Sequence, residues 1–191
     1  RSVYRDGNYI DVSGKDFKDF MAGKLEGFEG QYPTLKDWED HMTTAFPEVR
    51  LKKFLEMRGA DGGPWAKICA LPAFWTGLLY DDEARAAAYH MISDWTHEEH
   101  VHLRDSVPRT ALHTPFRNQT VRDLALEALN ISHGGLCRRS RLDGMGLDET
   151  HFLRTLFQTA ESGLTPAEEL LAAYEGRWNN SICPVFQEYA Y

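Results

Sequence analysis

The stretch that decides how this sequence folds is Val49-Arg50-Leu51-Lys52-Lys53-Phe54-Leu55-Glu56-Met57-Arg58. Apolar side chains occupy mainly the odd positions and charged side chains the even ones, with Lys53 and Phe54 as the exceptions. A period of two is typical of a β-strand with one packed face and one charged face. We therefore predict a strand over residues 49–58. Its charged face carries Arg50, Lys52, Glu56 and Arg58.

The residues before this strand predict short elements joined by turns. Residues 4–10 contain Asp6-Gly7-Asn8 between two β-prone runs and predict a hairpin. A helix is expected over residues 15–22, and residues 25–33 predict a loop. Thr34 is placed to N-cap a second helix over residues 37–44. This part of the chain therefore combines strands and loops with two short helices.

The residues after the strand predict helices. The expected spans are residues 65–79 with a kink or an interruption at Pro72, 82–93, a helix capped by Thr96 and Glu99 that ends before Pro108, 120–132 with a stop at Gly134-Gly135, 148–162 and 165–176. The aromatic residues expected in the core are Trp38, Trp65, Phe74, Trp75 and Tyr80. Strands first and helices afterwards define an α+β protein. At 191 residues we expect one domain, with a strand-and-loop part over 1–64 and a helical part over 65–191.

Composition excludes several classes of partner. The net charge of −8 argues against nucleic acid. The longest apolar run, residues 68–80, is too short to span a bilayer, so no membrane partner is expected. Three scattered cysteines are too few for a disulfide framework, which favours a cytoplasmic location. The first residue is Arg1 rather than Met, and we expect the chain to come from a longer protein.

The charged face of residues 49–58 suggests phosphoryl-transfer chemistry. Transfer from ATP needs carboxylates that hold Mg²⁺ and cations that neutralise phosphate, and Glu56 and Arg58 are of these types. Arg58 is equally suited to holding a substrate carboxylate through a bidentate contact. The pattern alone favours a simpler interpretation, a strand whose charged face lies in solvent.

Two other motifs carry little chemistry on their own. The glycine-rich residues 61–65 match neither a P-loop nor a Rossmann fingerprint, and a strand-to-helix connection is favoured. His97 and His100 are three residues apart, whereas the zinc-protease motif needs four. The start of a solvent-exposed helix is favoured over a metal site there.

A family resemblance adds what these patterns leave open. Residues 37–65 read DWEDHMTTAFPEVRLKKFLEMRGADGGPW and are followed by CALPAFW at 69–75. Together they closely resemble glutamate–cysteine ligase of the plant and proteobacterial type. The sequences TPFR at 114–117, LTPAE at 164–168 and PVF at 184–186 resemble the same family. The resemblance covers essentially the whole chain and identifies it as the C-terminal portion of such a ligase.

The resemblance implies a fold and a reaction. The fold is part of a glutamine-synthetase-like antiparallel sheet followed by a mostly helical C-terminal region. ATP phosphorylates the side-chain carboxylate of glutamate, and the cysteine amine attacks the acyl phosphate, which is the first step of glutathione biosynthesis. Glu56 would bind Mg²⁺, and Arg58 would act as the catalytic residue that contacts phosphate or glutamate. Lys52 and Trp65 would line the substrate pocket.

The resemblance also bears on regulation and completeness. Cys69 falls where some plant members carry a redox-regulatory cysteine, but Val12 and Gly27 replace a second regulatory pair, so a buried apolar role is favoured. The partners implied are glutamate, cysteine, ATP and the upstream remainder of the same chain. Because that remainder would hold most metal carboxylates, this chain is expected to be inactive alone. A plastid location is expected if a transit peptide precedes it.

Two alternatives to this ligase remain open. The first is a related carboxylate–amine ligase that uses another amine, because the cysteine-binding residues are not identifiable here. The second is a non-enzymatic helical interaction domain whose charged strand is merely solvated.

Overall fold

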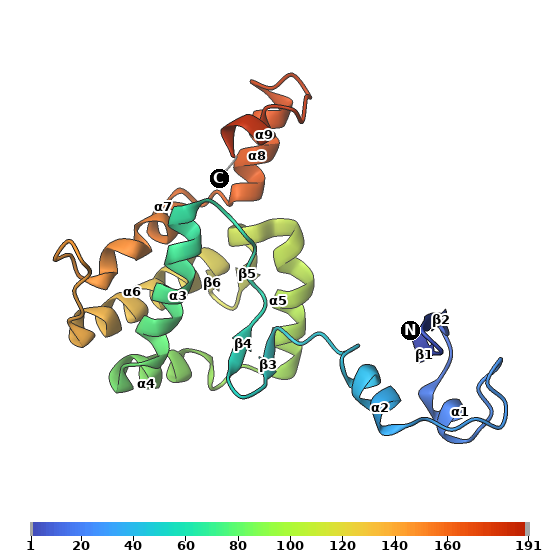
Figure 1. Cartoon of the computed structure of the whole chain (residues 1–191). Helices are drawn as coiled ribbons and strands as arrows, with labels where there is room; N and C mark the ends of the chain where they lie inside the picture. Colours follow the sequence, from blue (N-terminus) through green and yellow to red (C-terminus); the bar gives the residue numbers. More distant parts are fainter. Residues whose placement is uncertain (1, 190–191) are drawn as a thin grey trace. The chain divides into compact units, whose positions relative to one another are not determined.

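The computed structural model describes residues 2–189, which fall into two compact units, residues 2–60 and 61–189 (Figure 1). Small antiparallel hairpins occupy the first unit, and helices dominate the second. This confirms the α+β class with a mostly helical C-terminal region. The grouping of both units into one domain stays a prediction, as does the larger antiparallel sheet that the family resemblance implies.

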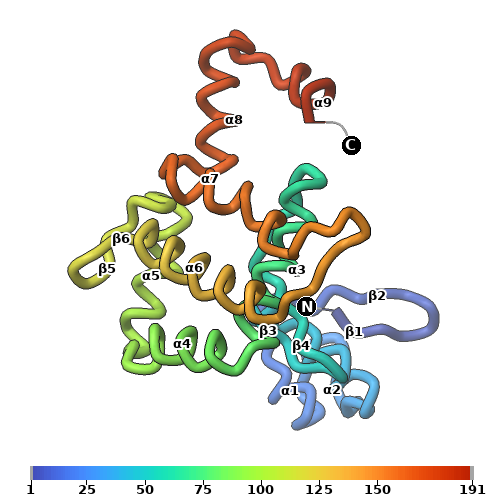
Figure 2. Tube along the Cα trace, turned by 90° about the vertical axis from the view of Figure 1, so that its left-hand side faces the viewer, coloured from blue at the N-terminus to red at the C-terminus, as the bar shows by residue number. Residues whose placement is uncertain are grey.

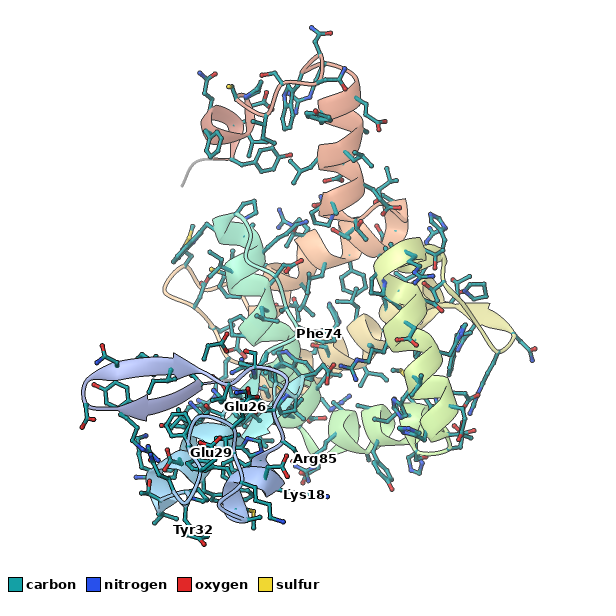
Figure 3. The ribbon with its side chains drawn as sticks, turned by 90° about the vertical axis from the view of Figure 1, so that its right-hand side faces the viewer. Lys18, Glu26, Glu29, Tyr32, Phe74 and Arg85 are labelled. Atoms are coloured by element: carbon teal, nitrogen blue, oxygen red, sulfur yellow. The ribbon has the colours of Figure 1, made fainter. Side chains whose placement is uncertain are left out.

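The first unit contains two hairpins and two short helices. Its elements are β1 (Ser2–Arg5), β2 (Asn8–Asp11), α1 (Phe17–Met21), α2 (Leu35–Met42), β3 (Val49–Leu51) and β4 (Leu55–Met57). The predicted first hairpin is confirmed, and its turn places Asp6 and Gly7 at positive φ. The long loop between the helices contains Glu26, Glu29 and Tyr32, which are labelled in Figure 3.

A small apolar cluster and an ion pair connect the first hairpin, α1 and α2. The buried residues of the cluster are Val3, Val12, Phe20, Leu25 and Phe28. The Arg5 guanidinium donates to both carboxylate oxygens of Asp37, at 2.7 and 2.9 Å. Asp37 also accepts from the backbone N–H and the hydroxyl of Thr34. The backbone N–H of Asp37 in turn donates to Oγ1 of Thr34 at 3.2 Å, which confirms Thr34 as the N-cap of α2. These contacts, led by the bond from Arg5, lower the pKa of Asp37 to about 2.

The predicted ten-residue strand is a hairpin instead. β3 and β4 pair with Arg50 opposite Glu56 and Leu51 opposite Leu55, and a turn at residues 52–54 joins them. The backbone N–H of Lys52 donates to the carbonyl of Phe54 across the turn at 2.9 Å. The two residues that broke the alternation, Lys53 and Phe54, are therefore turn residues. A three-residue turn keeps the even positions of both strands on one face, so the period-two pattern continues through it.

The apolar face of this hairpin is also not packed as predicted. Leu51 and Leu55 are 79% and 57% exposed, and Val49 is 48% exposed. The side chains of Arg50, Glu56 and Arg58 are each less exposed than these leucines. The charged face is therefore the more enclosed of the two.

The second unit is a helical assembly with one further hairpin. Its elements are α3 (Trp65–Leu79), α4 (Asp82–Ile92), α5 (His97–Thr110), η1 (Ala111–His113), β5 (Pro115–Phe116), β6 (Gln119–Thr120), α6 (Val121–Arg139), η2 (Glu149–Leu153), α7 (Arg154–Ser162), α8 (Pro166–Glu175) and α9 (Val185–Glu188). The predicted capping boxes at Thr96 and Thr165 are confirmed. Among the described residues, none of the helices has the length and apolar character needed to cross a membrane.

Helices α3 and α6 pack against each other (Figure 2), and glycines of both helices lie at the contact. A Cβ atom added to Gly135 would lie 2.0 Å from the carbonyl oxygen of Gly77. The Ser132 hydroxyl donates to the carbonyl of Phe74 on α3 at 2.9 Å. The prediction that Gly134-Gly135 stops the helix is therefore wrong, because α6 continues to Arg139. Gly135 serves close packing rather than termination.

Apolar residues from three elements complete this core. Ala73 of α3, Leu136 of α6 and Leu153 of η2 form a buried cluster, and Phe74, labelled in Figure 3, packs against it. Cores assembled in this way give one contiguous packed region per domain. The second unit therefore has a core of its own.

The prediction for Pro108 and part of the aromatic prediction are wrong. Helix α5 includes Pro108 in its last turn and ends at Thr110. A proline near a helix end removes only a bond that fraying would weaken in any case. Helix α3 is continuous through Pro72, so the predicted interruption is absent there, whereas the alternative of a kink stays a prediction. Trp38, Trp65 and Tyr80 are 45%, 75% and 72% exposed rather than in the core.

Candidate functional site

Three charged side chains of the β3–β4 hairpin meet at one carboxylate oxygen. Nε of Arg50 donates to Oε2 of Glu56 at 2.8 Å, and Nη1 of Arg58 donates to the same oxygen at 3.1 Å. Arg50 reaches Glu56 because the strand register places them directly opposite each other. Arg58 reaches it because two residues along a strand lie on the same face. We call Arg50, Glu56 and Arg58 the hairpin cluster.

The two guanidinium groups keep Glu56 ionised. The pKa of Glu56 lies below its usual value, chiefly because of the hydrogen bond from Arg50 and next because of the bond from Arg58. The nearby positive charge of Lys52 lowers it further. The side chains of the cluster remain 27–30% exposed, so solvent and small ligands reach them.

Arg58 is held from two further directions. Its backbone N–H donates to the carbonyl of Glu48 at 2.8 Å, which extends the strand pairing by one residue. Its guanidinium lies 5.5 Å from the centre of the Phe46 ring, within the range of a cation–π contact. Phe46 also lines a cavity of about 330 Å³ between the first hairpin, α1 and α2. Arg58 therefore contacts a residue that lines this cavity.

The remaining predicted site residues occupy different places. Lys52 lies in the turn rather than in a strand, and its side chain is exposed. Trp65 is the first residue of α3, in the second unit, and Cys69 follows it by about one helical turn. Cys69 is a half-buried free thiol, not a fully buried one. The structure brings Glu56 and Arg58 together, whereas the pocket-lining roles of Lys52 and Trp65 stay predictions.

The sequence pattern assigned no role in the site to Arg50. Its position on the charged face was recognised, but its contact with Glu56 depends on a strand register that the single-strand prediction did not contain. The signal that would have found it is the pair of residues, Lys53 and Phe54, that interrupts the alternation. An interruption of this kind marks a turn and implies cross-strand partners.

A Mg²⁺ ion fits the hairpin cluster only in part. A carboxylate oxygen is a ligand that Mg²⁺ prefers, and neither guanidinium donates to Oε1 of Glu56. However, among residues 2–189 no three His, Cys, Asp or Glu side chains are grouped so that they could hold a metal ion. Glu56 therefore fits the role of one ligand in a set completed by other groups.

The histidine-rich start of α5 has a structural partner. Glu99 caps the helix and accepts two bonds from Arg117, at 2.6 and 2.8 Å. The bond from Arg117 is the main cause that lowers the pKa of Glu99 to about 2. Nε2 of His102 lies 3.0 Å from the carbonyl oxygen of Pro115. These contacts fix α5 to the β5–β6 hairpin.

Comparisons with known proteins place this chain in a family of ligases. The model of a family described as Glutamate-cysteine ligase family 2 (GCS2) matches residues 3–188, so the chain belongs to that family. Glutamate–cysteine ligase A, chloroplastic, from Oryza sativa subsp. indica is 57% identical over 189 residues, which cover 99% of this chain and 37% of that protein.

Similar proteins from other plants give the same result. The chloroplastic glutamate–cysteine ligases of Nicotiana tabacum and Arabidopsis thaliana are 51% and 49% identical over 99% of this chain. The chain covers 35% of each of them. It therefore spans little more than a third of the length of the curated relatives it matches.

Proposed function

We propose that the full-length protein is an ATP-dependent glutamate–cysteine ligase that carries out the first step of glutathione biosynthesis. The observation that carries this proposal is 57% identity to a glutamate–cysteine ligase over 99% of the chain. The hairpin cluster supports it, because an ionised carboxylate beside two guanidinium groups suits chemistry on phosphate and carboxylate groups.

The proposed reaction proceeds through γ-glutamyl phosphate. An oxygen of the glutamate side-chain carboxylate attacks the γ-phosphorus of ATP, the bond from that phosphorus to the β,γ-bridging oxygen breaks, and ADP leaves. The cysteine amine then attacks the acyl carbon, loses a proton, and the carbon–oxygen bond to phosphate breaks. Activation is needed because a free carboxylate is a poor electrophile, and each ligation consumes one ATP.

In this reaction Glu56 is proposed as one Mg²⁺ ligand and Arg58 as the catalytic cation. Mg²⁺, when bound, neutralises phosphate charge and orients the transferred group. Arg58 would contact the transferred phosphoryl group or the glutamate carboxylate, and its contacts with Glu48 and Phe46 support a fixed orientation. Lys52 and Trp65 are proposed to line the substrate pocket.

The chain alone is proposed to be inactive. Mg²⁺ in phosphoryl-transfer sites is usually held by one or two carboxylates together with substrate phosphates. Among the described residues, Glu56 does not belong to any group of three His, Cys, Asp or Glu side chains that could hold a metal ion. Mixing the isolated chain with ATP, glutamate and cysteine should release no ADP above background, and steady ADP release would refute this part of the proposal.

Substitution of Glu56→Gln in the full-length protein tests the assignment of the site. On phosphoryl-transfer logic, loss of a metal carboxylate should slow turnover at least about a hundredfold. Glu39→Gln is the matched control, because Glu39 lies on α2 of the same unit and its ion pair with Lys36 is long, at 4.0 Å. If both variants retain the full rate, a non-enzymatic interaction domain becomes the better interpretation of this chain within the full-length protein.

The amine substrate needs a separate test. Product formation with cysteine is compared with product formation from other amino acids at equal concentrations. Cysteine should be strongly preferred. A stronger preference for another amine would identify the protein as a related carboxylate–amine ligase instead.

A plastid location is proposed for the full-length protein. The relatives are described as chloroplastic, and this favours the plastid over the cytoplasm suggested by the cysteine content. A fluorescent fusion of the full-length protein should accumulate in plastids, and diffuse cytosolic fluorescence would contradict the proposal.

A further inference from the structure

We propose that Arg50 and Arg58 form a paired site for the polyphosphate of the nucleotide, with Glu56 holding the two guanidinium groups in place. This inference rests on the proposed use of ATP and adds Arg50 as a substrate-binding residue. It follows from the donors left over in the hairpin cluster, the charge of the hairpin and the neighbouring cavity.

The first argument concerns hydrogen-bond donors. A guanidinium carries five N–H donors on three nitrogens. Arg50 uses Nε and Arg58 uses Nη1 for Glu56, and within the described residues their other nitrogens donate no hydrogen bond. Both terminal nitrogens of Arg50 therefore remain for a ligand. Phosphate oxygens are the acceptors that such a planar pair of donors fits best.

The second argument concerns the relative position of the two groups. The bonded nitrogens of Arg50 and Arg58 lie 2.8 and 3.1 Å from the same oxygen, so they cannot be farther apart than the sum of these distances. Arg50 is also fixed by the strand register, and Arg58 by its contact with Phe46. Two like charges are thus held together before a ligand arrives. Preorganisation of this kind lowers the entropic cost of binding.

The third argument concerns charge. Residues 48–58 contain four cationic side chains and two carboxylates, a net charge of +2, whereas the whole chain carries −8. Glu56 balances only one of the two guanidinium groups that contact it. A polyanion would neutralise this positive segment more fully than a single carboxylate, and this favours the ATP polyphosphate over the glutamate side chain.

The fourth argument concerns space. Phe46 contacts the Arg58 guanidinium and also lines the cavity of about 330 Å³, whose wall includes Asp40, His41 and Thr44. Small-molecule pockets have volumes from roughly 300 to 1,000 Å³. The wall of this cavity holds the carboxylates of Asp16, Asp37 and Asp40, so it suits a part of the ligand other than the phosphates, which stay on the arginine pair outside it.

The test measures phosphate binding apart from turnover. Binding of inorganic tripolyphosphate to the full-length protein is followed by titration calorimetry with EDTA present, so that no metal contributes. Arg50→Gln should weaken binding by about tenfold or more, because hydrogen bonds to charged groups contribute about 1.5–3 kcal/mol each. Arg50→Lys keeps the positive charge but loses the planar pair of N–H donors, so its affinity for tripolyphosphate should be intermediate. Circular dichroism of each variant checks that the fold is retained.

Two controls separate this inference from a structural role and from the proposed function. Arg85, labelled in Figure 3, forms an exposed 2.8 Å ion pair with Asp82 on α4, and Arg85→Gln should leave tripolyphosphate binding unchanged. In steady-state kinetics Arg50→Gln should raise the KM for ATP while the KM for glutamate stays within about twofold.

Three outcomes would overturn the inference. Equal tripolyphosphate affinity of Arg50→Gln and the unmodified protein would do so, as would absence of tripolyphosphate binding to the unmodified protein. A selective rise in the KM for glutamate would assign Arg50 to the carboxylate instead. If Glu56→Gln still abolishes turnover in any of these cases, the proposed ligase function stands and only the role of Arg50 is lost.

Discussion

The crossing of α3 and α6 gives the sharpest prediction about stability. In Gly135→Ala the new Cβ would lie 2.0 Å from the carbonyl oxygen of Gly77 and 3.0 Å from Cβ of Ala84. The closest atom belongs to the backbone of another helix, so it cannot rotate away. Ordinary contact begins near 3.4 Å, so the helices must separate by about 1.4 Å at this point. The variant should therefore be destabilised.

The size of the effect follows from two opposing contributions. Overpacking of a core costs roughly 1–3 kcal/mol, and a backbone clash places this site at the upper end. Replacement of glycine by alanine inside a helix contributes about 1 kcal/mol in the opposite direction. The net destabilisation should be about 2 kcal/mol, which lowers the melting temperature by about 4–8 °C for a chain of this size.

Gly134→Ala is the matched control on the same helix. Its new Cβ would meet only the flexible side chain of Arg138, at 3.4 Å, so the helix-propensity gain should dominate. This variant should be more stable than the parent by up to about 1 kcal/mol. Both are measured by urea unfolding followed by far-ultraviolet circular dichroism, which reports mainly on the helical second unit. A Gly135→Ala variant as stable as Gly134→Ala would refute the close-packing argument.

Two further predictions concern ion pairs. The pKa of Asp37 in the folded chain, about 2, lies below its usual value of 3.8. Its stabilising effect is therefore present above about pH 4 and is lost as the pH falls toward 2. Asp37→Asn should be less stable than the parent at neutral pH. Urea unfolding at several pH values should show that the variant has lost this acid dependence of stability. An unchanged dependence would exclude the Arg5–Asp37 pair as its source. Arg117→Gln should raise the pKa of Glu99 from about 2 toward 4.5, because the guanidinium supplies its strongest contact, and an NMR titration that finds no rise would contradict this.

Helix starts could be predicted from the sequence because their signals are local. Thr34, Thr96 and Thr165 each cap a helix as predicted, through a hydroxyl that accepts from the backbone three residues ahead. A cap needs only the residue itself and the first turn of its helix. Such contacts are fixed by sequence neighbours and need no knowledge of tertiary packing.

Helix ends were less predictable, because glycine and proline have more than one use. Gly163 ends α7 at positive φ, as predicted, whereas Gly134 and Gly135 lie inside α6. The difference is the close approach of α3, a contact between residues far apart in the sequence. Pro108 likewise lies within the last turn of α5. Local composition gave no means to separate these cases.

The candidate site shows the same division between local and long-range information. Glu56 and Arg58 were selected from residue type, period and family resemblance, and the structure places their side chains in contact. The placement of Lys52 within a strand was wrong, because a period-two pattern cannot distinguish one strand from a hairpin with a three-residue turn, whereas its pocket-lining role stays a prediction. Arg50 entered the site only through the strand register.

The turn at residues 52–54 has a consequence for how this segment tolerates insertions and deletions. Its length sets whether Arg50 faces Glu56 or the opposite side of the ribbon, since a one-residue change in register inverts every side chain of a strand. Loss or gain of a single codon here would separate the two guanidinium groups while leaving every amino acid of the cluster in place. We therefore expect the length of this turn to be constrained more tightly than the identity of its residues.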